Sequence, residues 1–373
     1  SLLYYTVRMK HAAVFRGRHL YLAGSTALTP LADAQPHEAY AGDLGGITTL
    51  NLPAWVEQHL YEPGAAIARL ADSPEKLAAL VARTRSLDIT LLAGLPHWAL
   101  LVAAALRESA GPGQGRIADL QALWPNFECF IHGGAPIGPF QDELRAALGP
   151  TVKFHEVYPA SEGFIAAQDV EPGSGLRLMA DVGLFYEFIP MADFDESRLE
   201  QLGRKVLPLD GVKTGVDYAL LLTTPAGLAR HVIGDVVRFT SLEPPRLIYV
   251  GRTQLKLNAV GENVIEKELT DALVGVCRRH GWSIVNFHVA PIFAHSPTGQ
   301  NRGRHEWWVE LRPGTIITPT GPNLAVELDL ALQKLNDRYA ARRKTGSLAA
   351  PAVQTAQGLA WNTIMRQIGR AHV

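Results

Sequence analysis

Apolar runs typical of strands alternate with amphipathic runs typical of helices through the first half of the chain. Ile89–Leu92 predicts a buried strand, and Pro96–Glu108 predicts the helix that follows it. The alternation also gives strands at His19–Leu22, Phe127–Ile131 and Val152–His155, and helices at Ser1–Val14, Ser73–Arg85 and Pro139–Leu148. Strands that alternate with helices in this way favour an α/β domain.

The second half of the chain has a different pattern of predicted strands and helices. Four further strands are predicted at Leu184–Pro190, Leu220–Thr223, His231–Phe239 and Arg246–Val250. A smaller α+β unit then follows, with helices at Val264–Arg278 and Leu324–Tyr339 and strands at Val285–Val289 and Glu306–Leu311. We therefore expect a large domain over 1–252, a small domain over 253–355 and a tail over 356–373.

Composition restricts the classes of partner. The chain has 47% hydrophobic and 19% charged residues and a formal net charge of −1, which suits a globular protein and gives no overall field for nucleic acid or anionic membrane. No apolar run approaches the roughly 20 residues of a membrane span. The two cysteines, Cys129 and Cys277, form neither a disulfide framework nor a metal-ligand spacing. With no signal peptide in view, we expect a cytoplasmic monomer.

Gly133-Gly134-Ala135-Pro136 follows directly after a predicted apolar strand. Glycines at such a point let the backbone approach a flat or charged ligand closely. Ligands of open α/β sheets bind at the carboxyl ends of strands. A plain strand-to-helix turn would give the same four residues, so the motif alone leaves both interpretations open.

The segment Tyr158-Pro159-Ala160-Ser161-Glu162-Gly163 follows the next strand and is expected to form a loop. Tyr158 could stack on a base, and Ser161 could bond a phosphate oxygen. Glu162 could hold Mg²⁺, a hard cation that prefers carboxylate oxygens. The alternative is a solvated polar loop without a ligand.

Gly234-Asp235 interrupts the apolar run Val232–Val237. An acid inside such a run is costly unless it is paired or used, and a carboxylate that accepts from two ribose hydroxyls would explain it. Gly251-Arg252 ends a later strand, shortly before Gly261-Glu262, and its guanidinium could bond phosphate or ribose. A surface hairpin acid and an isolated Gly-Arg pair are the alternatives.

Pro96-His97-Trp98 lies at a strand-to-helix junction. His97 and Trp98 could line a pocket for an acyl group, although core packing is the commoner role of a single tryptophan. Cys129, inside the strand before the glycine motif, is expected to be a small buried hydrophobe and not a nucleophile.

Taken together, these motifs resemble those of the acyl acid amido synthetase family, whose known members conjugate plant hormones such as auxin and jasmonate to amino acids. The resemblance covers Ser1 to about Val353 and includes the late stretch Arg342–Pro351. It implies an adenylate-forming α/β domain, incomplete here, with a smaller α+β C-terminal domain. It also implies ATP and Mg²⁺ as cofactors, and a small carboxylic acid and an amino acid as substrates. No nucleic acid or membrane partner is implied.

The resemblance implies roles for individual residues. Nucleotide contacts would come from Gly133, Gly134, Ala135, Tyr158, Ser161, Asp235 and Arg252. Glu162 would hold Mg²⁺ and, with Arg252, act in catalysis. Arg252 stands where the small, mobile domain of the family begins.

Three departures from the family pattern affect the expected activity. The phosphate loop rich in Ser, Thr and Gly has no counterpart, and Ser1 resembles a point just after it. Nothing after Val353 resembles the C-terminal segment with its catalytic lysine, and Gln254 stands where an acidic hinge residue is common. The tail Ile368–Val373 resembles one reading frame of a sequencing adapter. We therefore expect an active full-length parent and a weak or inactive fragment.

Three alternative functions remain open at this point. An acyl-CoA ligase of the same superfamily would pass the acyl group to a thiol. A serine hydrolase would use Ser161 in Pro-x-Ser-x-Gly, with His132-Gly133-Gly134 as oxyanion loop and Asp235 and His288 as guesses for the triad. A non-catalytic nucleotide-binding remnant would keep the motifs without the chemistry.

Overall fold

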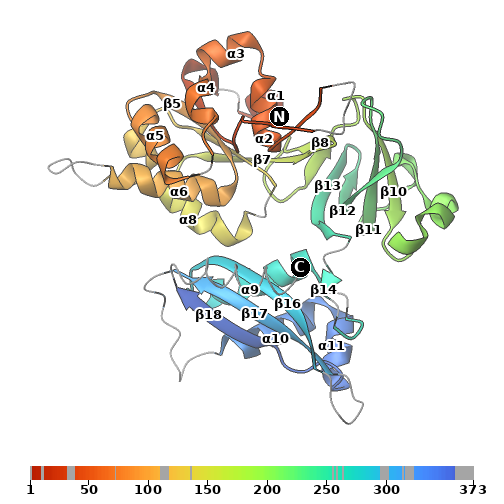
Figure 1. Cartoon of the computed structure of the whole chain (residues 1–373). Helices are drawn as coiled ribbons and strands as arrows, with labels where there is room; N and C mark the ends of the chain where they lie inside the picture. Colours follow the sequence, from red (N-terminus) through yellow and green to blue (C-terminus); the bar gives the residue numbers. More distant parts are fainter. Residues whose placement is uncertain are drawn as a thin grey trace. The chain divides into compact units, whose positions relative to one another are not determined.

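The computed structural model describes residues 2–9, 12–31, 38–71, 73–109, 117–134, 137–253, 256–257, 259–262, 264–294, 302–312, 315 and 323–357 (Figure 1). The chain divides into two compact units. The first comprises Ser1–Leu184 with Thr240–Leu247, and the second comprises Phe185–Phe239 with Ile248–Val373. The domain limits expected at 252 and 355 stay predictions.

Parallel strands form the centre of the first unit. Their order is β7-β6-β5-β1-β4, and they span Arg18–Leu22 (β1), Tyr61–Glu62 (β4), Ile89–Gly94 (β5), Cys129–His132 (β6) and Lys153–Ala160 (β7). The first four residues of β5 are all buried. This fits a strand of a parallel sheet that is covered on both faces. The predicted α/β class is confirmed.

Antiparallel strands continue the sheet beyond β7. A short turn reverses the chain into β8 (Gly163–Ala167), β9 (Leu176–Leu178) pairs with β8, and Arg246 and Leu247 of β13 (Pro245–Arg252) pair with β9. A small separate hairpin joins β2 (Thr29–Pro30) and β3 (Tyr40–Ala41).

One helix precedes the parallel strands of the first unit, and further helices connect them. They are α1 (Leu2–Arg8), α2 (Leu44–Leu50), α3 (Ala54–His59), α4 (Ala65–Ala68), α5 (Pro74–Thr84), α6 (Pro96–Glu108), α7 (Leu120–Leu123) and α8 (Gln141–Leu148), with 3₁₀ turns at Val14–Arg16 (η1) and Gly138–Phe140 (η3). The helix predicted after Ser73 is confirmed, because the Ser73 side chain accepts from the Lys76 amide at 3.2 Å and caps α5.

The first helix is shorter than predicted. The sequence predicts helix over Ser1–Val14, whereas α1 ends at Arg8 and a separate 3₁₀ turn begins at Val14. The Ala13 amide donates to Glu128 Oε2 at 2.8 Å, so a tertiary contact takes the place of the helical hydrogen bond there.

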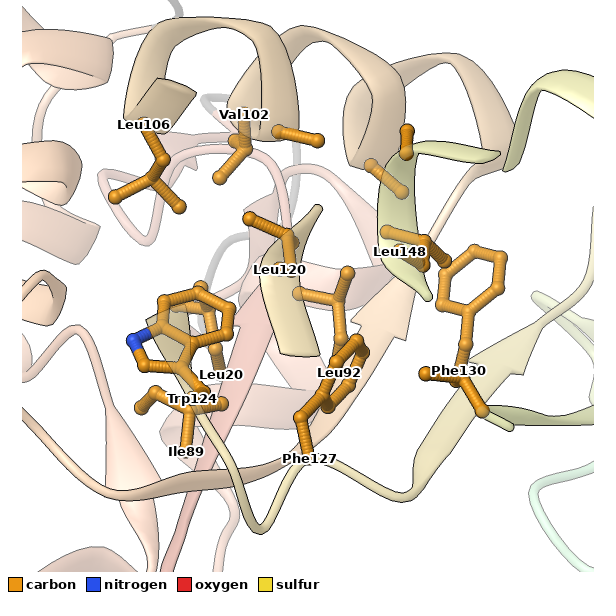
Figure 2. Packing of buried hydrophobic residues seen from close by; sticks show 14 of the residues in the cluster. Leu20, Ile89, Leu92, Val102, Leu106, Leu120, Trp124, Phe127, Phe130 and Leu148 are labelled. Atoms are coloured by element: carbon orange, nitrogen blue, oxygen red, sulfur yellow. The ribbon is translucent and has the colours of Figure 1, made fainter. Parts of the chain in front are cut away.

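The core of the first unit lies between the strands and helices α6 and α8 (Figure 2). Leu20, Ile89, Leu92 and Phe130 project from strands β1, β5 and β6 and meet Val102, Leu106 and Leu148 from the helices. All seven side chains are fully buried. Burying each of these side chains stabilises the fold by about 1.5–3 kcal/mol. This packing holds in place the strands whose ends carry the candidate site.

The second unit begins with four antiparallel strands in the order β10-β11-β12-β13. They span Phe185–Pro190 (β10), Asp217–Thr223 (β11), His231–Leu242 (β12) and the end of β13, with 3₁₀ segments at Glu196–Lys205 (η4) and Leu209–Gly211 (η5). All four predicted strands are confirmed. Phe188, Tyr218 and Phe239 pack edge to face on this sheet, with ring centroids 5.1–6.2 Å apart.

An α+β part completes the second unit. It contains a hairpin of β14 (Lys256–Leu257) and β15 (Val264–Ile265), a sheet of β16 (Ile284–Ala294), β17 (Arg302–Leu311) and β18 (Ala352–Gln357), and helices α9 (Glu266–His280), α10 (Leu324–Leu335) and α11 (Asp337–Lys344). Trp307, Val309, Leu328 and Leu332 are fully buried in its core.

The single helix predicted over Leu324–Tyr339 is wrong, because the chain breaks at Asn336. This residue has an extended backbone, and its side chain accepts from the Tyr339 amide at 2.8 Å, which starts α11 as a new helix. Its Nδ2 also donates to Glu268 Oε2 at 2.8 Å. Helical periodicity continued across this break, so the sequence pattern hid it.

Candidate functional site

The glycine turn at the end of β6 is crowded. A Cβ placed on Gly133 would lie 2.3 Å from the Val157 carbonyl oxygen, so no larger residue fits. Gly134 has a φ of +73°, and a Cβ there would lie 3.2 Å from Leu95 Cδ2, just before α6. The turn therefore lies at the carboxyl end of β6, as predicted, and also close to that of β5. Ala135 lies outside the described residues.

His132 is the last residue of β6 and precedes this turn. Its side chain is 4% exposed, and burial lowers its pKa to about 4. It packs against Phe130 and Phe154, with ring centroids at 5.6 and 6.2 Å. A neutral imidazole therefore stands next to the glycine turn at neutral pH.

Tyr158 lies in a strand, so the predicted loop over Tyr158–Gly163 is wrong. Strand β7 runs on to Ala160, which pairs with Gly163 of β8, and leaves Ser161 and Glu162 as a two-residue turn. The pairing register shifts between Tyr158 and Pro159, which accommodates the proline in an antiparallel pair. Tyr158 is 8% exposed, whereas Glu162 at the turn is partly exposed.

This hairpin also bears on the serine hydrolase interpretation. A nucleophile elbow joins a strand to a helix. Ser161 instead joins two antiparallel strands, β7 and β8. Ser161 therefore lacks the backbone context of an elbow. Cys129 is fully buried as predicted, and burial raises the pKa of its thiol, so it is no nucleophile.

Asp235 is held at an irregularity of β12. The register with β11 shifts between Ala219 and Leu221, and Gly234 has a φ of +83° at this point. Such a bulge with a left-handed glycine re-aims the next side chain. Asp235 is only 6% exposed, so the hairpin-acid alternative, which needs a solvated carboxylate, does not describe it.

Arg252 and Asp235 are brought together, as the motif order suggests. Arg252 Nε lies 3.3 Å from Asp235 Oδ1, and its Nη1 donates to the Ile233 carbonyl oxygen at 3.4 Å. The Thr253 amide donates to the Gly234 carbonyl at 2.7 Å and ties the two motifs through the backbone. The Arg252 side chain is 52% exposed, so it can also reach a ligand in solvent.

Two residues beside this pair were missed by sequence reasoning. Tyr249 donates its hydroxyl to Glu266 Oε2 at 3.2 Å, across from β13 to the first turn of α9. Burial, then the charges of Glu266 and Asp235, raise the pKa of Tyr249. A polar aromatic two residues before Gly251 was the available signal, but tyrosine is common in strands.

Gly261-Glu262 lies in the α+β part of the second unit. Glu262 and His305 are both fully buried, and His305 Nε2 lies 2.8 Å from Glu262 Oε1. A Cβ on Gly261 would lie 2.9 Å from Arg342 Nη2. His305 belongs to a strand far along the chain, so no local motif could have identified this pair.

Trp98 both packs on the core and lines a hollow at the carboxyl ends of β1 and β4. The hollow is lined by Tyr21, Tyr61 and Lys76 among others, and it encloses only about 10 Å³, roughly the space of one water molecule. His97 is exposed and is not among the residues that line it.

Within the described residues, no three His, Cys, Asp or Glu side chains converge on a point that could hold a metal ion. Mg²⁺ is commonly bound by one or two carboxylates together with substrate phosphates, so a single carboxylate such as Glu162 remains compatible with it. In the part of the chain that the structure describes, no helix combines the length and the apolar character of a membrane span.

Two family descriptions match the chain. Residues 177–252 match the GH3 family central domain, and residues 267–372 match the GH3 family C-terminal domain. The first match contains Asp235 and Arg252, and the second contains His305.

Curated relatives point to the same family. An indole-3-acetic acid-amido synthetase of Arabidopsis thaliana, GH3.10, is 30% identical over 40% of this chain and 27% of its own length. A GH3 domain-containing protein of Homo sapiens is 27% identical over 67% of this chain and 47% of its own length. The chain thus spans less than half the length of these relatives.

The solved structure of AtGH3.15 acyl acid amido synthetase in complex with 2,4-DB superposes with a TM-score of 0.73 at 17% identity, covering 100% of this chain and 72% of that one. This likeness shows the fold. The two domain matches, the relatives and the shared fold together show that the chain contains the central and C-terminal domains of the GH3 family.

Proposed function

We propose that the protein activates a small carboxylic acid with ATP and joins the resulting acyl group to the amine of an amino acid. The observation that carries the proposal is the buried Asp235 carboxylate with Arg252 Nε 3.3 Å away, inside a segment that matches the GH3 central domain. Relatives described as acid-amido synthetases and as a jasmonoyl-L-amino acid synthetase of Nicotiana attenuata support the reaction class.

The proposed reaction has two steps, formation of the acyl-adenylate and transfer of the acyl group to the amine. A carboxylate oxygen of the acid attacks the α-phosphorus of ATP, and the bond to the departing pyrophosphate breaks. The amine nitrogen then attacks the acyl carbon of the mixed anhydride, AMP leaves, and the proton of the amine passes to solvent. Positioning and neutralisation of charge supply most of the acceleration in such chemistry.

Roles are assigned within each unit. In the first, the tight turn of Gly133 and Gly134, with Ala135 beyond the described residues, gives a flat base access to the backbone. Tyr158 would flank the nucleoside, and Ser161 would bond a phosphate oxygen. Glu162 offers a partly exposed carboxylate in a turn, which suits a Mg²⁺ ion that also binds phosphate oxygens. When bound, Mg²⁺ would offset the charge of the phosphates.

In the second unit, Asp235 would accept hydrogen bonds from the ribose hydroxyls. Arg252 fixes this carboxylate, and its exposed guanidinium would bond phosphate or ribose as the small domain moves between the two steps. His97 and Trp98 would lie at the acyl group. We further propose a cytoplasmic monomer without nucleic acid or membrane partners, consistent with a formal net charge of −1.

The test is acid-dependent exchange between ATP and pyrophosphate, followed by trapping with amino acids or with coenzyme A. In the full-length parent, Glu162→Gln should lower exchange by about 10²-fold or more, because it removes the metal-binding charge. Glu171→Gln, which changes an exposed carboxylate of the same unit, is the matched control. Unchanged exchange in Glu162→Gln would refute the metal role, and capture by coenzyme A alone would refute amide synthesis.

A further inference from the structure

A buried hydroxyl stands beside the pair formed by Asp235 and Arg252. Thr253 follows Arg252 directly after β13, and it is 6% exposed. Among the residues that the structure describes, none forms a hydrogen bond with Thr253 Oγ1. Buried polar side chains nearly always have a partner, because a hydroxyl withdrawn from water without one is costly. This hydroxyl is therefore open to a partner that the chain itself does not supply.

Backbone contacts fix Thr253 next to the bulge of β12. Its amide donates to the Gly234 carbonyl oxygen at 2.7 Å, and Gly234 immediately precedes Asp235. Threonine is branched at Cβ, so few rotamers are open to its side chain once the backbone is held. The hydroxyl is therefore preorganised at the point where β12 presents the Asp235 carboxylate.

Gly234 leaves space between this hydroxyl and Arg252. A Cβ placed on Gly234 would lie 3.9 Å from Thr253 Oγ1 and 3.4 Å from Arg252 Nη1, which are ordinary contact distances. The guanidinium is the movable wall of this space, because its side chain is 52% exposed and its bond to the Ile233 carbonyl oxygen is long, at 3.4 Å. A ligand atom that displaces this bond can therefore approach the Thr253 hydroxyl.

The charges around this space favour a neutral hydroxylated group over a phosphate. Burial raises the pKa of Tyr249, and the charges of Glu266 and then Asp235 raise it further, whereas the charge of Arg252 lowers it. Two carboxylates and one guanidinium therefore act on this one side chain. A phosphate would meet the repulsion of both carboxylates, and a neutral group would not.

A ribose matches the hydrogen-bonding groups on both sides of this space. Each of its hydroxyls has one hydrogen to donate and an oxygen that accepts, whereas the ionised Asp235 carboxylate only accepts. A hydroxyl that donates to Asp235 still needs a donor for its oxygen, and the O–H of Thr253 supplies one. The two neighbouring hydroxyls of a ribose can thus engage Asp235 and Thr253 together.

We propose that Thr253 donates a hydrogen bond to a ribose hydroxyl of the nucleotide and makes the site selective for ribonucleotides over deoxyribonucleotides. This inference rests on the proposed function, which places the ribose at Asp235. A site that hydrogen-bonds a substrate hydroxyl rejects the analogue without it, because its own buried polar groups are then left unpaired.

The decisive experiment is calorimetric titration of the chain with AMP, 2′-deoxy-AMP and 3′-deoxy-AMP. AMP should bind about tenfold more tightly than the deoxynucleotide that lacks the contacted hydroxyl. Thr253→Val keeps the shape of the side chain and should lower AMP affinity by about fivefold without further weakening that deoxynucleotide. Thr253→Ser, which retains a hydroxyl, should keep the preference for AMP.

Thr224→Val is the matched control. Thr224 follows β11 and is 8% exposed, and its Oγ1 likewise has no hydrogen-bond partner among the described residues. It lies beyond the pairing of Leu222 with His231, away from the bulge at Gly234. The two threonines therefore share their burial and differ in their distance from Asp235, and Thr224→Val should leave all three affinities unchanged.

The outcomes separate this inference from the proposed function. Equal binding of AMP and both deoxynucleotides by the unmodified chain overturns the inference, whether or not Thr253→Val folds. An equal loss of affinity for all three nucleotides in a folded Thr253→Val overturns it as well. AMP binding that depends on Asp235 but not on Thr253 overturns the inference and leaves the proposed function standing. Absence of AMP binding to the unmodified chain overturns both.

Discussion

Glu262 and His305 form a fully buried pair, with His305 Nε2 2.8 Å from Glu262 Oε1 and no exposed surface on either side chain. The same carboxylate accepts from the amides of Ala259 at 2.6 Å and Val260 at 2.8 Å. The Glu262 side chain therefore links the turn at 259–262 to β17, where His305 lies 43 residues further along the chain.

This pair predicts a specific pH dependence of stability. Burial acts to raise the pKa of Glu262, but the hydrogen bonds from His305, Ala259 and Val260 outweigh it and lower the pKa to about 2. Because the pKa of Glu262 in the folded chain lies below its unfolded value near 4.5, the ionised carboxylate stabilises the fold at pH values above 4.5. This stabilisation is lost as the pH falls from 4.5 through about 2. Urea unfolding between pH 7 and pH 2 measures it.

Glu262→Gln should destabilise the second unit by about 2–4 kcal/mol at pH 7, because an amide cannot accept from all three donors. The difference in unfolding free energy from the unmodified chain should shrink as the pH falls below about 4.5, where the Glu262 carboxylate of the unfolded chain begins to bind a proton. Glu306→Gln, on the same strand as His305 and paired with Arg304 at 3.6 Å, is the control. A gap that is constant over pH would contradict the assignment.

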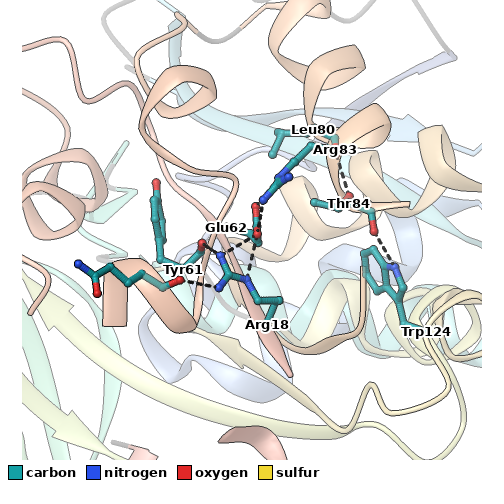
Figure 3. Close-up of polar contacts among 8 residues, drawn as sticks. Arg18, Tyr61, Glu62, Leu80, Arg83, Thr84 and Trp124 are labelled. Carbon is teal, nitrogen blue, oxygen red and sulfur yellow. Dashed lines mark hydrogen bonds and ion pairs between the residues drawn. The ribbon is translucent and has the colours of Figure 1, made fainter. Parts of the chain in front are cut away.

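Glu62 offers a sharp contrast between a buried and an exposed ion pair. Glu62→Ala removes a fully buried carboxylate and its hydrogen bonds from the guanidiniums of Arg18 and Arg83, whose side chains are 26% and 48% exposed (Figure 3), and it should cost about 1–3 kcal/mol in unfolding free energy. Asp217→Ala breaks the ion pair with Arg238, in which the arginine side chain is 36% exposed and the aspartate side chain 27%. This change should cost only about 0–1 kcal/mol. Comparable losses in denaturant titrations of the two variants would show that Glu62 is not the anchor of β4 and α5.

A larger residue at Gly133 should weaken nucleotide binding without changing the charge of the site. Gly133→Ala would bring a methyl group to 2.3 Å from the Val157 carbonyl, so the turn must shift, and nucleotide affinity should fall by about tenfold or more. Gly138→Ala adds a methyl group in open space a few residues later and should bind normally. Equal affinities in both variants would rule out the turn as a nucleotide contact.

Periodic segments were predictable because local pattern and tertiary burial agree. Helix α6 has the predicted limits, Pro96 and Glu108, and the strand predicted at Ile89 is β5. The resemblance also identified the family correctly. Asp235 could be identified because burying a carboxylate within an apolar run is costly unless the carboxylate is paired or used. The irregularity of β12 at Gly234 is where the structure accommodates it.

The errors arose where tertiary contacts overrule local pattern. Tyr158 lies in β7 because pairing with β8 extends the strand beyond the apolar run that predicted it. Asn336 splits a helix because its side chain caps the next one. Glu266 and His305 gain their roles from partners distant in sequence, which one sequence without relatives does not reveal.

We propose that this chain contributes the ribose contact of an adenylate-forming site through Asp235. It is tested most directly by titrating AMP into the chain and into Asp235→Asn, with Asp217→Asn as a control on the neighbouring strand. We expect binding to the unmodified chain and to Asp217→Asn, and an affinity lower by about tenfold or more in Asp235→Asn, because a charge-assisted hydrogen bond is lost. Equal AMP affinity in the two variants, with Asp235→Asn folded, would contradict it.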